Sequence, residues 1–344
     1  MSANSAPPLA ALFGCSGLAL SEAERAFFAR VNPLGFILFA RNIDTPDQVR
    51  GLVRSLRDTV GRPDAPVLID QEGGRVARLR PPHWRAYPPA AAFGRLSAAN
   101  PAAGVEAAQL NARLIALELI DLGIDVDCVP VLDVPVEDAH DIIGDRAFCN
   151  TPARVAELGR AVCVGMLLEG VLPVIKHIPG HGRARVDSHE ALPVVNASLA
   201  ELEATDFLPF RAMADAPWAM TAHVVYTAVD PDAPATTSAK VIAEVIRGTI
   251  GFSGVLISDD LGMKALGGGF DERARAALAA GCDVVLHCSG NLAEMEAVAA
   301  GAAPLTGAAL SRLARATGLR RSHDGIDRAQ TLARINELLK AVEA

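Results

Sequence analysis

The stretch 151-TPARVAELGRAVCVGMLLEGVLPVIKH-177 contains the repeating unit on which the fold depends. Thr151 followed by Pro152 is typical of a helix start and Gly170 of a helix end, so residues 151–170 are predicted to form a helix. The apolar run at 171–177, which follows at once, is typical of a buried strand. A strand placed directly after a helix predicts a parallel sheet whose strands are connected and covered by helices.

The same alternation is found along the rest of the chain. Short runs rich in Val, Ile, Leu and Phe predict eight strands, at residues 11–17, 35–40, 66–70, 125–134, 171–177, 218–226, 254–260 and 283–289. Helices are predicted at 21–31, 45–60, 100–123, 151–170, 198–214, 237–250, 271–281 and 291–301. Eight such units that close on themselves form a (β/α)8 barrel of the TIM type. An open doubly wound sheet is the alternative, and it is less favoured because no G-x-G-x-x-G follows the first strand.

The domain organisation follows from length and from the absence of linkers in the sequence. A chain of 344 residues is long enough for one large barrel, and no low-complexity stretch divides it. Residues 1–344 are therefore predicted to form a single (β/α)8 domain. Residues 302–344 are expected to add terminal helices that pack on the outside of the barrel.

Charge and composition exclude several classes of partner. The net charge is −8 and no basic run is long enough to follow a phosphate backbone, so a nucleic acid is not expected. No segment has 18 consecutive apolar residues, and the N-terminus lacks a basic region ahead of its apolar run, so neither a membrane span nor export is expected. The six cysteines include no C-x-x-C pair, which favours buried thiols and a cytoplasmic location. A monomer is favoured.

Polar residues collect where the predicted strands end, which is where barrel enzymes place their active sites. These residues are Asp70, Asp133, Arg146, Lys176, His177, His223 and Asp259. They are dispersed in sequence, but the barrel would bring them together in space.

The run 176-KHIPGHGRARVDSHEALP-193 is open to three interpretations. His177, His181 and His189 could ligate a metal in a metal-dependent barrel hydrolase, although I-P-G between the first two forbids a helix there. They could also only hold a polar loop together, as is expected of His181. Alternatively Asp187, two residues before His189, can reach its ring and tune it for acid and base catalysis.

Two further motifs carry carboxylates at strand ends. In 254-GVLISDDLGM-263, Asp259 and Asp260 should point in opposite directions, so Asp259 is expected to face a substrate and Asp260 to form a salt bridge or helix cap. In 68-LIDQEGGRVARLR-80, Asp70 precedes a glycine pair and Arg78, an arrangement that suits a ligand but is also compatible with a tight loop.

The ordered set IDQEGGRV, GDRAF, KHIPGHG, DSH-x-x-LP and SDDLGM resembles the motifs of glycoside hydrolase family 3, in its β-N-acetylglucosaminidase branch from peptidoglycan recycling. The resemblance implies a retaining exo-glycosidase on a (β/α)8 barrel. Its implied substrates are peptidoglycan fragments with a terminal non-reducing N-acetylglucosamine, such as GlcNAc-anhydroMurNAc, with or without peptide. No cofactor or metal is implied.

The resemblance also implies a role for each matching residue. Asp259 matches the nucleophile, His189 the acid/base, and Asp187 the carboxylate that orients and tunes it. The sugar-contacting positions correspond to Asp70, Arg78, Arg146, Lys176 and His177. One segment departs from the family pattern, since 182-GRARV-186 replaces a loop that is acidic or polar in many members. A sugar-binding protein without turnover is a further alternative, disfavoured because all three catalytic positions are filled.

Overall fold

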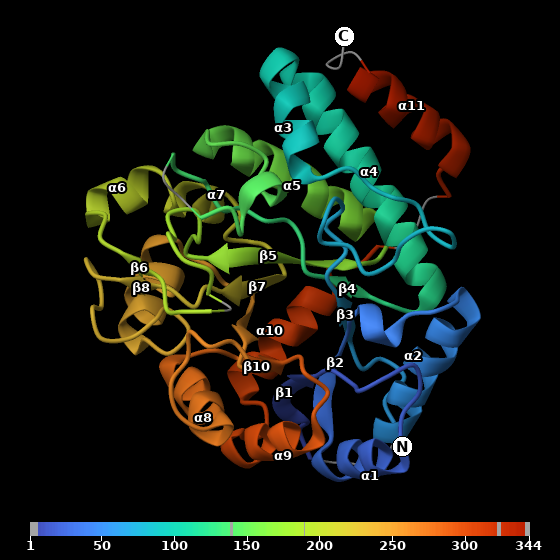
Figure 1. Ribbon diagram of the computed structural model, residues 1–344, viewed down its shortest axis with the longest axis vertical. Coiled ribbons are helices and arrows are strands. Elements are labelled where there is room, and N and C mark those ends of the chain that lie inside the picture. The colour runs from blue at the N-terminus through green and yellow to red at the C-terminus, as the bar shows by residue number, and fades with distance from the viewer. Residues whose placement is uncertain (1–5, 138–139, 189, 322–324, 341–344) are drawn as a thin grey trace.

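The structure, a computed structural model, describes residues 6–137, 140–188, 190–321 and 325–340. Within these ranges, eight parallel strands close a barrel in the order β1-β10-β9-β7-β5-β4-β3-β2. Helices surround the barrel (Figure 1). The predicted (β/α)8 barrel is therefore confirmed.

All eight predicted strand regions contribute a strand to the barrel. The strands are β1 (Leu9–Phe13), β2 (Pro33–Leu38), β3 (Val67–Ile69), β4 (Val126–Asp127), β5 (Leu172–Ile178), β7 (Trp218–Thr221), β9 (Val255–Asp260) and β10 (Val284–His287). A small parallel pair, β6 (Val194–Val195) and β8 (Val225–Tyr226), lies beside the barrel. Strand β6 and the pairing were not predicted, whereas β8 is the end of the strand predicted at 218–226, which the structure divides into β7 and β8.

The helices are α1 (Glu22–Val31), α2 (Pro46–Val60), α3 (Ala90–Ala99), α4 (Pro101–Leu122), α5 (Pro152–Leu168), α6 (Leu199–Ala204), α7 (Phe207–Ala212), α8 (Phe270–Ala280), α9 (Leu292–Gly301), α10 (Gly307–Thr317) and α11 (Arg328–Lys340). A π-helix, η3 (Val241–Thr249), and two 3₁₀ turns, η1 (Ala40–Asn42) and η2 (Gly144–Arg146), complete the set in the described ranges.

Two helical regions differ from the sequence prediction. The single helix predicted at 198–214 is two helices, and Pro209 explains the break because it has no N–H to donate to the carbonyl of Thr205. Helix α3 was not predicted. Its N-cap is Pro89, which makes no side-chain cap, so the usual start signal is missing there.

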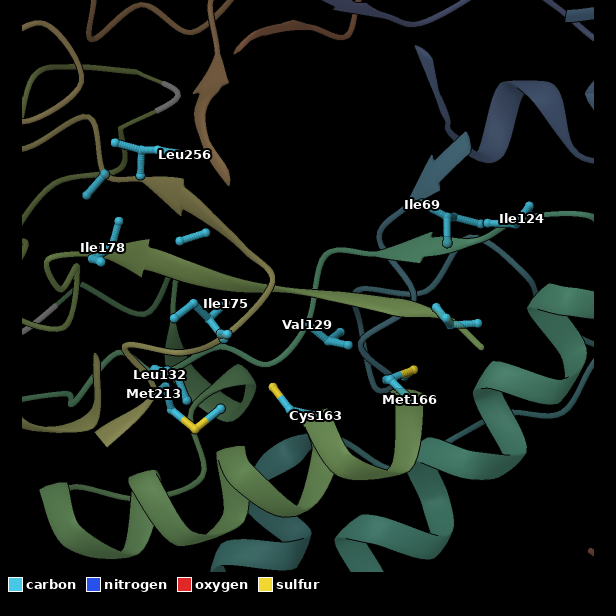
Figure 2. Packing of buried hydrophobic residues seen from close by; sticks show 14 of the residues in the cluster. Ile69, Ile124, Val129, Leu132, Cys163, Met166, Ile175, Ile178, Met213 and Leu256 are labelled. Atoms are coloured by element: carbon cyan, nitrogen blue, oxygen red, sulfur yellow. The ribbon is translucent and has the colours of Figure 1, made fainter. Parts of the chain in front are cut away.

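The core consists of two layers that follow from the period of two along each strand. One set of strand residues fills the barrel interior, including Leu68, Val174 and Ile257. The alternate set faces outward to the helices, where Ile175 of β5 belongs to the same apolar cluster as Cys163 of α5 (Figure 2). This packing fixes the strand ends, and so the residues that follow them, in space.

The C-terminal helices lie against the rest of the molecule. Leu305 and the α10 residues Ala309 and Ala316 belong to the same apolar cluster as the barrel interior. Helix α11 packs along α4 (Figure 1). None of the helices in the described part of the chain is long and apolar enough to span a membrane.

Candidate active site

Strand alternation decides which polar side chains enter the barrel. On β5, Lys176 lies on the same face as Leu172 and Val174, which fill the barrel interior. On β9, Asp259 stands in the same relation to Val255 and Ile257. The same apolar pattern that builds the core therefore sends one ammonium and one carboxylate to the open end of the barrel.

A cavity of about 200 Å³ lies at this C-terminal end of the strands. It brings together six residues that the sequence singled out for nucleophilic attack or sugar binding, namely Asp70, Arg78, Arg146, Lys176, His177 and Asp259. Its wall also includes Glu72, His181, Ser188 and Asp260. Position at the carboxyl ends of the strands is typical of TIM-barrel active sites.

Lys176 is the centre of a buried charge network on one side of this cavity. Its Nζ lies 2.9 Å from Oδ1 of Asp70 and 2.6 Å from Oε1 of Glu72. Arg78 donates to the other oxygen of Asp70 at 3.1 Å, and Arg146 donates to both oxygens of Glu72 at 2.9 Å. The arrangement holds these five side chains in fixed orientations, because each carboxylate forms ion pairs with two cations.

The network shifts the pKa of each carboxyl group. Burial alone would raise the pKa of Asp70, but the Lys176 ammonium and the Arg78 guanidinium hold it well below its ordinary value. Burial likewise opposes the ionised form of Glu72, and Lys176 and Arg146 lower its pKa. Burial would lower the pKa of Lys176, but the two carboxylates raise it above its ordinary value. All three groups are therefore charged at neutral pH.

Asp133 fixes the start of the loop that follows β5. Its Oδ1 accepts from the amides of His177 at 3.1 Å and His181 at 2.7 Å. Its Oδ2 lies 2.7 Å from Nδ1 of His177. Burial opposes ionisation of this carboxyl, but the neighbouring His177 and the donated bonds lower its pKa to about 2. The carboxylate then accepts from Nδ1–H, and Nε2 becomes the ring nitrogen of His177 that a ligand can use.

His181 is buried and belongs to the framework of the loop, as expected. Its Nε2 lies 3.2 Å from Oγ of Ser188, and its ring is in edge contact with that of His177. Burial and the nearby His177 lower the pKa of His181 to about 4, so this ring is neutral at physiological pH.

The end of β9 is held by backbone groups and a histidine. Asp259 Oδ1 accepts from the amide of Asp260 at 2.8 Å. Asp260 Oδ1 in turn accepts from the amides of Gly262 at 2.9 Å and Cys288 at 3.0 Å, so its main partners are backbone groups at the ends of β9 and β10. His223 Nε2 lies 3.0 Å from the carbonyl of Asp260. Both aspartates line the cavity.

The predicted acid/base lies outside the described residues, because these stop at Ser188 and resume at Glu190. Asp187 lies in the same loop, where its carbonyl accepts from the amides of Glu190 and Ala191 at 2.9 Å. No group of three His, Cys, Asp or Glu side chains placed to hold a metal ion occurs within the described ranges, to which His189 does not belong.

Two residues that organise the site were not among the predicted site residues. Glu72 lies inside the motif IDQEGGRV, but an acidic residue in a glycine-rich turn gives no sign that it will be buried. Asp133 was noted only for its place after a strand. Its partners, His177 and His181, lie more than forty residues away, and only the closed barrel shows that they meet.

Comparison with known proteins agrees with this arrangement. Residues 13–313 match the model of the glycosyl hydrolase family 3 N-terminal domain. The chain is 41% identical over 285 residues to a β-hexosaminidase of Alkalilimnicola ehrlichii, which covers 81% of this chain and 80% of that protein. The structure of this chain matches that of NagZ from Neisseria gonorrhoeae in complex with N-trifluoroacetyl-D-glucosamine. The TM-score is 0.87 at 32% sequence identity, and the match covers 97% of this chain and 99% of the other. A structure of the neisserial protein in complex with a zinc ion matches with a TM-score of 0.85 at 30% identity, covering 97% and 99% of the two chains.

Proposed function

The chain belongs to glycosyl hydrolase family 3 and is a β-hexosaminidase-type glycosidase, and on this premise we propose that it removes terminal non-reducing N-acetylglucosamine from peptidoglycan fragments. GlcNAc-anhydroMurNAc, with or without peptide, is the proposed substrate. The observation that carries the proposal is the position of Asp259, which lines a cavity together with five polar residues suited to sugar hydroxyls. We also propose a cytoplasmic location, with which six free cysteines are compatible.

In the first step, Asp259 attacks the anomeric carbon. A bond forms between a carboxylate oxygen and C1, and the bond from C1 to the leaving oxygen breaks. The imidazolium of His189 gives its proton to that oxygen, so the departing group leaves as a neutral alcohol. The product of the step is a covalent glycosyl-enzyme.

In the second step, the neutral imidazole of His189 takes a proton from water while the water oxygen attacks C1. Asp259 leaves as a carboxylate, and the sugar is released with its original anomeric configuration. Asp187 orients the ring and favours its charged form during the first step. One group thus acts as acid and then as base.

The charge network around Lys176 supplies fixed hydrogen-bonding groups for the sugar. Asp70 and Glu72 accept, and Lys176, Arg78 and Arg146 donate, from positions set by their mutual ion pairs. His177 adds its Nε2, since Nδ1 is occupied by Asp133. Because these groups are already oriented, little conformational entropy is lost when a sugar binds.

A chromogenic aryl β-N-acetylglucosaminide tests the activity and the role of His189 together. The wild type is expected to release the phenol. NMR should show the β-anomer of the released sugar as the first product. His189→Ala should lower the rate of hydrolysis of the natural disaccharide by about 10²–10⁴-fold, which is the usual contribution of general acid catalysis. The same variant should lower the rate of the first step far less on an aryl glycoside, because a stable phenolate can leave without a proton. Wild-type rates of His189→Ala on the disaccharide would contradict its role, and no phenol release by the wild type would exclude the activity.

Metal removal separates the glycosidase from the metal-dependent alternative. Because every proposed step uses only Asp259, His189 and Asp187, incubation with EDTA followed by gel filtration is expected to leave the initial rate unchanged. A fall in rate that added zinc restores would instead favour a metal held by the histidines of the 177–189 segment. The neisserial relative, which has been crystallised with zinc, makes this control necessary.

A further inference from the structure

Arg183 lies in 182-GRARV-186, the segment in which this chain departs from the usual family loop. The structure shows which groups its guanidinium contacts. Its Nε donates to Oδ2 of Asp206 at 2.7 Å, and its Nη2 donates to Oγ1 of Thr205 at 2.9 Å. Asp206 and Thr205 form the junction between α6 and α7, which lies outside the cavity. The arginine therefore connects the catalytic loop to the helical layer.

The Asp206 carboxyl group depends on Arg183 for its charge. Asp206 is 2% exposed, and Oδ2 accepts from Arg183 and from the Thr205 hydroxyl at 2.6 Å. Its other oxygen is buried and has no hydrogen-bond partner among the residues that the structure describes. Burial raises the pKa of this carboxyl, so the neighbouring guanidinium is the main group that favours the ionised form.

The ion pair lies beside a close contact between the loop and the α6–α7 junction. A Cβ on Gly180 would come within 3.0 Å of Cβ of Asp206, so this part of the backbone rests directly on the α6–α7 junction. The carbonyl of Gly180 accepts from the hydroxyl of Tyr226, and the carbonyl of Gly182 accepts from the amide of Val136 at 3.2 Å. A Cβ on Gly182 would meet the carbonyl oxygen of Val134 at 2.0 Å, so this contact is also close.

The first half of the loop is thus attached to separate parts of the molecule. Residues 180–183 are held by Asp133, which follows β4, by Tyr226 of β8 and by the α6–α7 junction. Further along, Ala184 accepts from the amide of His140 at 2.8 Å, and Ser188 contacts His181 within the loop itself. Residues 180–183 lead directly into the segment that carries Asp187, so their attachments fix the place where that segment begins.

We propose that Arg183 is a positioning residue for the hydrolytic reaction, because its ion pair with Asp206 fixes the loop that carries Asp187 and His189 relative to the cavity. The inference rests on the proposed function, since it takes His189 as the acid/base. Without the guanidinium, Asp206 becomes a buried carboxylate with no cation. It must then take up a proton or turn outward to water, and either change releases the loop from the α6–α7 junction.

The test compares two substrates in Arg183→Met. An acid that is misplaced by about 1 Å can cost on the order of 10²-fold in rate. We expect kcat on the natural disaccharide, whose leaving oxygen needs a proton, to fall by about 10–100-fold. On an aryl glycoside with a good leaving group, the rate of the first step should fall by less than about 3-fold. Arg183→Lys, which keeps the charge and one donor, should recover part of the loss.

The matched control is Arg113→Met. Arg113 donates to Oε1 of Glu169 at 2.6 Å between α4 and α5, and Glu169 is also 2% exposed with one oxygen unbonded among the described residues. This control should lose thermal stability without dependence on the leaving group. The double variant Arg183→Met/Asp206→Asn should regain stability, because no buried charge is left, but it should keep the selective loss on the disaccharide.

Three outcomes would overturn the inference. They are equal rate losses on both substrates in Arg183→Met, a selective loss in Arg113→Met, or wild-type kinetics in the double variant. If Arg183→Met does not fold, Arg183→Lys and the double variant give the same comparison. His189→Ala is measured alongside as the reference. If it shows no leaving-group dependence, the acid/base assignment fails and the inference fails with it, whereas dependence there and none in the Arg183 variants overturns the inference alone.

Discussion

Asp259→Ala is expected to abolish turnover while leaving the barrel folded. Loss of a covalent nucleophile slows other enzymes by on the order of 10⁴-fold or more, and the same scale is expected here for both aryl and natural substrates. The variant should fold because Asp259 lies at the open end of β9, beyond the apolar residues that pack the interior. Steady-state hydrolysis and thermal unfolding, measured on the same preparation, check both statements.

Azide distinguishes loss of the nucleophile from general damage to the site. In Asp259→Ala the small anion can enter the space left by the carboxylate and attack C1 of an activated aryl glycoside, which gives the α-glycosyl azide. In His189→Ala the glycosyl-enzyme still forms, and azide would attack from the opposite face to give the β-glycosyl azide. Release of the β-product by Asp259→Ala, or turnover near the wild-type rate, would show that Asp259 is not the nucleophile.

The fold could be predicted from sequence because its signals are local and repeated. Each strand run is apolar on both faces, as a strand buried between a barrel interior and a helical layer must be. The elements that were not predicted depend on contacts between segments that are distant in sequence or lack a capping signal. The pairing of β6 with β8 joins segments about thirty residues apart, and the two strands have only two residues each. Helix α3 begins without a capping side chain and is held instead against α4.

The sequence predicted several of the polar residues that line the cavity, but not the contacts between them. The motifs placed Asp70, Lys176 and Asp259 at strand ends, and the structure brings all three to one cavity. The sequence did not show that Glu72 would be buried beside Lys176. The two residues are more than one hundred positions apart in the chain, and only the strand order shows that β3, which precedes Glu72, and β5, which carries Lys176, are separated by the single strand β4.

The partner of Arg183 was equally inaccessible from sequence. The motif comparison showed that 182-GRARV-186 is unusual, and a loop with two arginines would ordinarily be assigned to solvent. Asp206 lies between two short helices in a region predicted as one continuous helix. In that prediction its carboxylate has no reason to face the loop. The ion pair could therefore be foreseen only with knowledge of the break between α6 and α7.

Lys176→Met is expected to be the most destabilising change in the site. Met fills a similar volume, but it leaves Asp70 and Glu72 without the cation that lies between them, and Lys176 is only 2% exposed. Removal of one partner from a buried ion pair costs about 3–5 kcal/mol of the free energy of unfolding. Substrate affinity should fall as well, because the orientation of both carboxylates depends on this ammonium. Urea denaturation and KM for the aryl glycoside measure the two effects.

The same variant should show a characteristic pH dependence. The pKa of Asp70 is depressed in the native protein, so its contribution to stability is present above the ordinary carboxyl pKa and is lost as pH falls through the native value. In Lys176→Met the pKa values of Asp70 and Glu72 should rise, because burial is then opposed only by Arg78 and Arg146. The stability difference from wild type is therefore expected to be widest near pH 7 and to narrow towards about pH 4, where the carboxyls can take up protons.

Lys264→Met provides the control for this effect. Lys264 is exposed and follows Met263 at the edge of the cavity, so its replacement removes the same charge without leaving a buried carboxylate. Its effect on the free energy of unfolding should remain within about 0.5 kcal/mol, as is usual for exposed positions, at both pH values. An equal and pH-independent loss in the two lysine variants would show that Lys176 acts through overall charge. A loss in Lys176→Met alone that narrows with acidification would show that the buried ammonium holds the two carboxylates ionised in the site.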